Sequence, residues 1–226
     1  MLEGNPIISF SFDDFPHSAL QVAGNMLAEH GIQGTYYAAL GLMGSQTSVG
    51  MMFDKYDLSL LIKAGHELAC HTFDHVAAHT TNRKALEAQC AKNRAAVAEL
   101  LNGYQMQNFS FPSGSVTLGG KMAAAAEYES CRTTDQGINH GVVDLTYLRA
   151  VPVYSSVSMK NIRQIITENI RRRGWLILYT HDIELSPSLY GCTPQMFRDT
   201  LSLAMASGAE ILSVANAVKR FRLLSS

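Results

Sequence analysis

The stretch Gly65-His66-Glu67-Leu68-Ala69-Cys70-His71-Thr72-Phe73-Asp74-His75 organises the predicted fold, because it joins a short apolar run to a pair of histidines. Upstream, a second apolar run at residues 7–12 ends at Asp13 and Asp14. Two imidazoles and one carboxylate can form a metal site with three protein ligands and room for a water molecule. We therefore interpret the rest of the chain as a scaffold that brings residues 13–14 next to residues 71–75.

Size and composition are those of a globular protein with a substantial core. Of the 226 residues, 47% are hydrophobic and 16% are charged, which excludes a disordered chain. The net charge is −1, and the basic triplet at residues 171–173 is better explained as a solvated helix end than as a nucleic-acid contact. We expect one domain over residues 1–226 and no nucleic-acid partner.

The cysteines and the N-terminus favour a cytoplasmic protein. The four cysteines show no C-x-x-C spacing, so we expect reduced thiols. The first residues contain no basic region followed by an apolar core, and no apolar run reaches transmembrane length. We therefore expect a cytoplasmic location and no membrane partner.

Short apolar runs rich in β-branched and aromatic residues alternate with segments of helical periodicity. Strands are expected at residues 7–12, 34–39, 66–70, 107–111, 130–134, 147–153, 175–180 and 210–212. Helices are expected at residues 18–30, 54–64, 82–101, 118–127, 159–173, 194–207 and 214–223, and a loop at residues 41–50. This alternation predicts an α/β fold with seven or eight parallel strands, either a closed barrel or an open doubly wound sheet.

The reactive residues favour the barrel, because they fall at or just after the ends of the expected strands. They are Asp13-Asp14, His71, Pro112-Ser113-Gly114, Asp135 and His181-Asp182. In a β/α barrel these ends share one face, where the loops build the active site. A doubly wound sheet also binds ligands at strand ends, but it brings five separate strands together less easily. No G-x-G-x-x-G follows the first strand, which argues against a nucleotide-binding site.

Neighbouring carboxylates at the end of an apolar strand are costly unless a cation or hydrogen bonds meet them. Asp13 or Asp14 could instead cap the next helix, but Ser18 lies nearer the helical pattern. Adjacent side chains of a strand point to opposite faces, so one aspartate can bind a metal while the other acts as a base. By themselves, His71 and His75 fit two ordinary loop histidines as well as a metal site.

Four motifs occur in a fixed order along the chain. They are Ser11-Phe12-Asp13-Asp14, then Gly65-His66-Glu67 with His71-Thr72-Phe73-Asp74-His75, then Phe111-Pro112-Ser113-Gly114, then Leu178-Tyr179-Thr180-His181-Asp182. In this order the chain resembles the polysaccharide deacetylase family, also called the NodB homology domain or carbohydrate esterase family 4. The resemblance spans roughly residues 7–215, and its first two motifs together are highly specific.

This resemblance implies a single catalytic domain, folded as a distorted (β/α) barrel with the active site at the C-terminal ends of the strands. It implies a divalent metal, usually zinc with cobalt or nickel as alternatives, bound by Asp14, His71 and His75. It further implies that Asp13 is the catalytic base and His181 the general acid.

The resemblance also implies that Pro112 and Ser113 lie on the substrate side, where the backbone N–H of Ser113 helps to hold the oxyanion. In such a mechanism the metal activates water and polarises the carbonyl, while the base and the acid move protons at different pKa values.

The chain departs from the family around the base and the acid. Ser110 stands where the third motif usually opens with an arginine that pairs with the catalytic aspartate, and Arg132 or Arg149 could supply that charge from a neighbouring strand. The family's aspartate–tryptophan motif is also not intact. Asp135 could orient His181, but no tryptophan follows Asp135.

The expected substrate pocket is also altered. Tyr179 replaces the leucine that lines the acetyl-methyl pocket in the family, and Phe15 replaces the glycine after the aspartate pair. These changes affect the expected substrate more than the expected metal.

The leading hypothesis is a metal-dependent hydrolase of non-peptide carbon–nitrogen bonds. It would remove an acyl group, foremost N-acetyl, from a sugar-containing small molecule or oligosaccharide. One alternative is hydrolysis of a non-sugar linear or cyclic amide on the same fold, and another is a metal- or carbohydrate-binding homologue with little turnover. No exposed seam indicates a particular oligomeric state.

Overall fold

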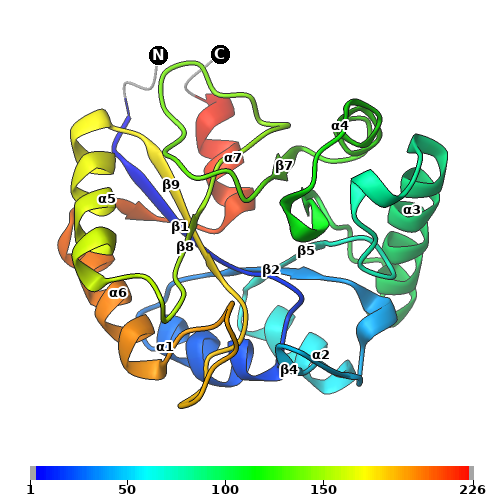
Figure 1. Ribbon diagram of the computed structural model, residues 1–226, viewed down its shortest axis with the longest axis horizontal. Helices are drawn as coiled ribbons and strands as arrows, with labels where there is room; N and C mark the ends of the chain where they lie inside the picture. Colours follow the sequence, from blue (N-terminus) through cyan, green and yellow to red (C-terminus); the bar gives the residue numbers. More distant parts are fainter. Residues whose placement is uncertain (1–3, 224–226) are drawn as a thin grey trace.

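The computed structural model describes residues 4–223, and its main sheet is a curled parallel sheet of eight strands. The strand order is β7-β6-β5-β2-β1-β9-β8, and β10 pairs with β1 (Figure 1). The strands are β1 (Ile7–Phe12), β2 (Thr35–Ala38), β5 (Glu67–Cys70), β6 (Asn108–Ser110), β7 (Ser130–Arg132), β8 (Val151–Pro152), β9 (Trp175–Thr180) and β10 (Glu210–Ile211). The predicted distorted (β/α) barrel is confirmed.

Helices surround this sheet, and the last one lies within the ring that the others form (Figure 1). They are α1 (Asn25–Ala28), α2 (Lys55–Lys63), α3 (Arg83–Leu100), α4 (Leu118–Ala125), α5 (Met159–Arg172), α6 (Pro194–Ala206) and α7 (Val214–Leu223). Local chemistry sets where several of them begin. Asp54 forms a capping box with Asp57 at the start of α2, and Thr193 caps α6 just before its first-turn proline.

One irregular segment brings the two ends of the strand order together. Leu148 bridges to Arg132 of β7, and its N–H donates to the carbonyl of Cys131 at 2.8 Å. A few residues later, Val151 of β8 pairs with Leu178 of β9. The strand predicted at residues 147–153 is therefore reduced to Val151–Pro152, because the segment leaves β7 after Leu148 and joins β9 only at Val151.

The pleat of β1 separates the outer core from the barrel interior. Ile8, Phe10 and Phe12 pack in the large core, whereas Ile7 packs with β9 and α7. Between Ile7 and the strand end, Ser9 accepts a hydrogen bond from the indole of Trp175 at 2.9 Å. The same alternation continues to Asp13, whose N–H donates to the carbonyl of Thr180 at 3.0 Å.

A buried polar network centred on Glu67 ties β5 to its neighbours below the strand ends. Its carboxylate accepts hydrogen bonds from Thr35 at 2.8 Å and Asn108 at 2.6 Å. It also accepts the backbone N–H of Ala215, in the first turn of α7, at 2.8 Å. Burial raises the pKa of Glu67, while these hydrogen bonds act to lower it. The network fixes the strand that leads into His71.

One local prediction was wrong, and one predicted helix is present but differs in type along part of its length. The loop predicted at residues 41–50 holds an antiparallel hairpin, β3 (Gln46–Thr47) and β4 (Gly50–Met51), whose strands are too short for an alternating pattern. The helix predicted at residues 18–30 begins as a π-helix over Ala19–Gly24 and is α-helical only from residue 25 to residue 28. Within residues 4–223, no helix is both long and apolar enough to cross a membrane.

Candidate active site

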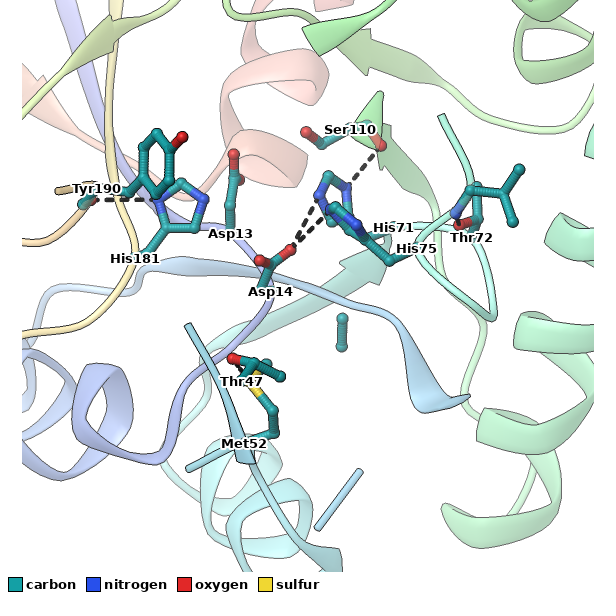
Figure 2. Close-up of polar contacts among 12 residues, drawn as sticks. Asp13, Asp14, Thr47, Met52, His71, Thr72, His75, Ser110, His181 and Tyr190 are labelled. Atoms are coloured by element: carbon teal, nitrogen blue, oxygen red, sulfur yellow. Dashed lines mark hydrogen bonds and ion pairs between the residues drawn. The ribbon is translucent and has the colours of Figure 1, made fainter. Parts of the chain in front are cut away.

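Asp14, His71 and His75, which we call the metal corner, come together at the ends of β1 and β5. Their candidate ligand atoms all lie within 4.8 Å of one another. The Oδ1 atom of Asp14 is 3.4 Å from Nε2 of His71 and 3.1 Å from Nε2 of His75 (Figure 2). The His71 ring is buried, whereas Asp14 and His75 are 15% and 30% exposed, so the site opens to solvent on one side.

The hydrogen bonds of the metal corner leave acceptor atoms facing one another, an arrangement that a bound cation would stabilise. Nδ1 of His71 lies 2.8 Å from the carbonyl oxygen of Ser110. A carbonyl can only accept, so Nδ1 carries a proton, and the neutral form of His71 that a metal requires points the lone pair of Nε2 at Asp14. The buried Oδ1 of Asp14 has no hydrogen-bond donor among the described residues. Two acceptors facing each other are unfavourable without a cation, and this donor set suits a divalent metal.

Electrostatics keep Asp14 in the ionised form that a carboxylate ligand needs. Burial acts to raise the pKa of Asp14, but the close imidazoles of His71 and His75 outweigh it and hold the pKa well below its ordinary value. Burial acts to lower the pKa of His75, and Asp14 more than reverses this. Asp14 is therefore ionised, as a carboxylate ligand must be.

Backbone turns at the metal corner were not predicted from the sequence. Asp14, Thr72 and His75 adopt left-handed conformations, with φ values of 61°, 60° and 54°. Such a conformation costs roughly 1–3 kcal/mol for a residue other than glycine, and it recurs at functional sites. The turn after β5 is closed by Val76, whose N–H donates to Oγ1 of Thr72 at 2.8 Å.

These turns also correct the prediction about the aspartate pair. The contacts to His71 and His75 come from Asp14, and Asp13 lies apart from them (Figure 2), but β1 ends at Phe12, so strand alternation does not separate the two aspartates. The separation follows from the left-handed backbone of Asp14 and Phe15, the latter with φ 62°. The Phe15 ring stacks on Phe53 with centroids 4.8 Å apart, so it fills the core and does not narrow a substrate pocket.

A second group, which we call the base corner, comprises Asp13, Ser110, Arg132, Tyr37 and Tyr179. Nη2 of Arg132 donates to Oδ1 of Asp13 and to Oγ of Ser110. The Asp13 carboxylate and the Arg132 guanidinium are both buried.

Arg132 and Arg149 were both candidates for the charge beside Asp13, and the structure selects Arg132. Arg149 is exposed, and its side chain packs beside Gly137.

Tyr37 and Tyr179 flank this arginine with their rings. The guanidinium carbon of Arg132 lies 5.0 Å from the ring centroid of Tyr37 and 4.8 Å from that of Tyr179. Tyr154 meets Tyr179 edge to face, with centroids 5.6 Å apart. The expectation for Tyr179 was a wall of the acyl pocket, and the ring contacts place it against the arginine that holds Asp13.

His181 follows β9 on the other side of Asp13 from the two metal-corner histidines (Figure 2). Its Nδ1 lies 3.2 Å from the carbonyl oxygen of Tyr190, so Nδ1 carries a proton and Nε2 faces the side of Asp13. Sequence reasoning missed Tyr190, because a backbone carbonyl leaves no signal in residue type. The Tyr190 loop is fixed by Asp182, which accepts two hydrogen bonds from Ser188 at 2.7 and 2.5 Å.

Asp135, the predicted orienting residue, has a different partner. Its Oδ2 accepts a hydrogen bond from Oη of Tyr147 at 2.6 Å. Orientation of His181 thus falls to the Tyr190 carbonyl, because Asp135 is held by the segment that leads into β8.

Pro112 and Ser113 follow β6 in a short 3-10 turn over Pro112–Gly114. Pro112 is buried, and Ser113 has a left-handed backbone with φ 56°. Gly114 is also left-handed, and a Cβ there would come within 1.8 Å of Oγ1 of Thr134. A larger residue at position 114 would therefore disturb the turn that presents the backbone of Ser113.

Comparisons with known proteins identify the family and the fold. A family model described as polysaccharide deacetylase matches residues 3–129, which is more than half of the chain. No curated protein sequence matches.

Solved structures of similar fold include the Xyl-CE4 domain of a multidomain xylanase from the hindgut metagenome of Trinervitermes trinervoides, with 17% identity, 96% and 91% of the two chains covered, and a TM-score of 0.64. They also include the chitin deacetylase of Colletotrichum lindemuthianum, with 13% identity, 94% and 87% covered, and a TM-score of 0.66. A third is a family 4 acetyl xylan esterase from Clostridium thermocellum in complex with a cobalt ion, with 14% identity, 93% and 89% covered, and a TM-score of 0.60.

At these identities the solved structures show a shared fold, and the family follows from the model match together with the motifs that carry Asp13, Asp14, His71 and His75. The chain therefore belongs to the polysaccharide deacetylase family.

Proposed function

We propose that this protein is a metal-dependent hydrolase that removes an acyl group, foremost N-acetyl, from a sugar-containing small molecule or oligosaccharide. One observation carries the proposal. The buried Oδ1 of Asp14 faces two imidazole Nε2 atoms without a hydrogen-bond donor, while the neighbouring Asp13 is held apart by Arg132. A ligand set beside a separate carboxylate is the arrangement that metal-assisted hydrolysis requires.

Asp14, His71 and His75 would hold the metal, which when bound would lower the pKa of water and polarise the scissile carbonyl. Two nitrogen ligands and one oxygen ligand suit zinc, and cobalt or nickel would also fit.

The chain's own residues would supply the proton transfers. Asp13 accepts a proton from the attacking water, and Arg132 holds the Asp13 carboxylate in place. The backbone N–H of Ser113 meets the negative charge that develops on the carbonyl oxygen. His181 donates a proton from Nε2 to the leaving nitrogen while Nδ1 stays bonded to Tyr190.

A metal- or carbohydrate-binding homologue with little turnover is the less supported alternative. Binding needs neither a base nor an acid, yet Asp13 is held by a buried arginine and His181 by a backbone carbonyl. Hydrolysis of a non-sugar linear or cyclic amide requires the same machinery, so only substrate tests separate it from sugar deacetylation.

A substrate screen tests the proposal. The purified protein, stripped of metal and reloaded with Zn²⁺ or Co²⁺, is incubated with N-acetylated chito-oligosaccharides, O-acetylated xylo-oligosaccharides, 4-nitrophenyl acetate and simple cyclic amides. Acetate release from the acetylated sugars that depends on added metal is the expected result. Failure to take up either metal at micromolar concentration, or equal rates with and without metal, would contradict the proposal.

A further inference from the structure

We propose that Arg132 is the positioning residue for the base Asp13, and that it does from strand β7 what a guanidinium at position 110 of strand β6 would otherwise do. The inference rests on the proposed function, because it assigns a task to the side chain that holds the base. It follows from the register of two strands, from the burial of one arginine and from the rings that flank it.

The strand register lets a side chain at position 110 or at position 132 reach the same part of the barrel interior. Ser110 and Arg132 are directly paired across β6 and β7, as are Asn108 and Ser130 on the same face below them. Asn108 accepts a hydrogen bond from Ser130 at 2.7 Å, which pins this register. A side chain from either upper position therefore enters the barrel at the same height.

The small side chain of Ser110 makes the exchange of positions workable. Its hydroxyl leaves space for the guanidinium and accepts a hydrogen bond from the same Nη2 that donates to Asp13. An arginine at both positions would set two cations against one carboxylate. A small residue at position 110 and an arginine at position 132 are therefore compatible, whereas an arginine at both positions is not.

The surroundings of Arg132 hold the guanidinium in one place. The side chain is fully buried, and Nη1 donates to the carbonyl of Thr133 at 3.1 Å. The rings of Tyr37 and Tyr179 flank the group, so lateral movement would cost both contacts. A charge buried this deeply is retained only where its partners compensate it, and Asp13 is the carboxylate that does so.

Holding Asp13 by Oδ1 has two consequences. It leaves the other carboxylate oxygen free to accept a proton, and it keeps Asp13 from turning toward a cation held by the adjacent Asp14. Without Arg132, the freed carboxylate can become an additional metal ligand, which would tighten metal binding while removing the base.

The test compares R132S, S110R and the double variant S110R/R132S with the wild-type protein, all loaded with Zn²⁺. The probe is 4-nitrophenyl acetate or whichever acetylated oligosaccharide the wild type hydrolyses. We expect R132S to lower kcat by about 100-fold with KM within about threefold. The double variant should recover at least about tenfold of that loss, while S110R alone should be slower than wild type.

R149S is the matched control, since Arg149 is exposed and lies outside the base corner, and its kcat should equal that of wild type. Zinc affinity, measured by calorimetry, should be unchanged or tighter in R132S. Thermal melting checks folding. If R132S does not fold, R132K and the double variant provide the test. R132K is expected to bind zinc normally and to turn over slowly, because lysine lacks the planar guanidinium that donates to Asp13 and Ser110 together.

Three results would overturn the inference. They are a kcat of R132S within about threefold of wild type, zinc affinity that falls in parallel with kcat, and a double variant as slow as R132S. A wild-type protein that hydrolyses no probe would contradict the proposed function. In that case the zinc affinities of wild type and R132S still decide the inference, because weaker binding by R132S would contradict it.

Discussion

The metal corner and the base corner lie side by side but are built in different ways. The metal corner takes two of its three residues from one turn after β5, where His71 and His75 are four residues apart. The base corner takes Asp13, Ser110 and Arg132 from three strands that are distant in sequence. Position 110 is a serine where the resemblance leads us to expect an arginine, while the metal corner contains every expected ligand.

The difference shows which constraint each corner must satisfy. A metal fixes ligand types and distances, so exchanging one ligand removes the site. A carboxylate base needs only a positive charge beside it. In a barrel, side chains from several strands can place that charge in the same interior. A family motif can therefore vary in the base corner without changing the chemistry, provided that a neighbouring strand compensates.

The largest effect is expected from the metal corner. His71→Ala removes the buried ligand and should abolish both zinc binding and metal-dependent hydrolysis, measured by calorimetry and acetate release. His79→Ala is the matched control, because His79 is exposed and bonds to Ser115 in the same region. If H71A bound zinc as tightly as wild type, the assignment of the metal corner would be wrong.

The next effect is expected at the acid, across from the metal corner. His181→Ala should lower kcat on an N-acetylated sugar by about 10²–10⁴-fold while zinc affinity stays unchanged. The loss should be much smaller on 4-nitrophenyl acetate, because nitrophenolate leaves without a proton. Equal losses on the two probes would show that His181 is not the general acid.

The smallest effect is expected from the rings around Arg132. Tyr179→Leu removes one flanking face and should lower kcat by about tenfold, since a desolvated cation–π contact is worth about 1–2 kcal/mol. Tyr179→Phe keeps the ring and should stay close to wild type. A Y179L rate equal to that of Y179F would mean that Tyr179 does not support the base corner.

Much of the fold and of the metal corner could be predicted from the sequence, because both depend on local patterns. Apolar runs predict the strands, and the spacing of His71 and His75 keeps both within one turn.

The base corner could not be resolved in this way. The choice between Arg132 and Arg149 depends on strand register, and the partner of His181 is the carbonyl of Tyr190, which no side-chain pattern encodes. Asp135 was proposed to orient His181 from the resemblance to the family, yet its carboxylate accepts a hydrogen bond from Tyr147 on the segment that joins the two ends of the sheet.

The most direct test removes the base and keeps the metal. Asp13→Asn is measured for zinc affinity by calorimetry and for acetate release from the probe that wild type hydrolyses best, with thermal melting to check folding. We predict one zinc ion bound with an affinity within about tenfold of wild type, and hydrolysis slowed by about 10²–10⁴-fold. Hydrolysis at the wild-type rate, or loss of zinc together with activity, would contradict the division between a base corner and a metal corner.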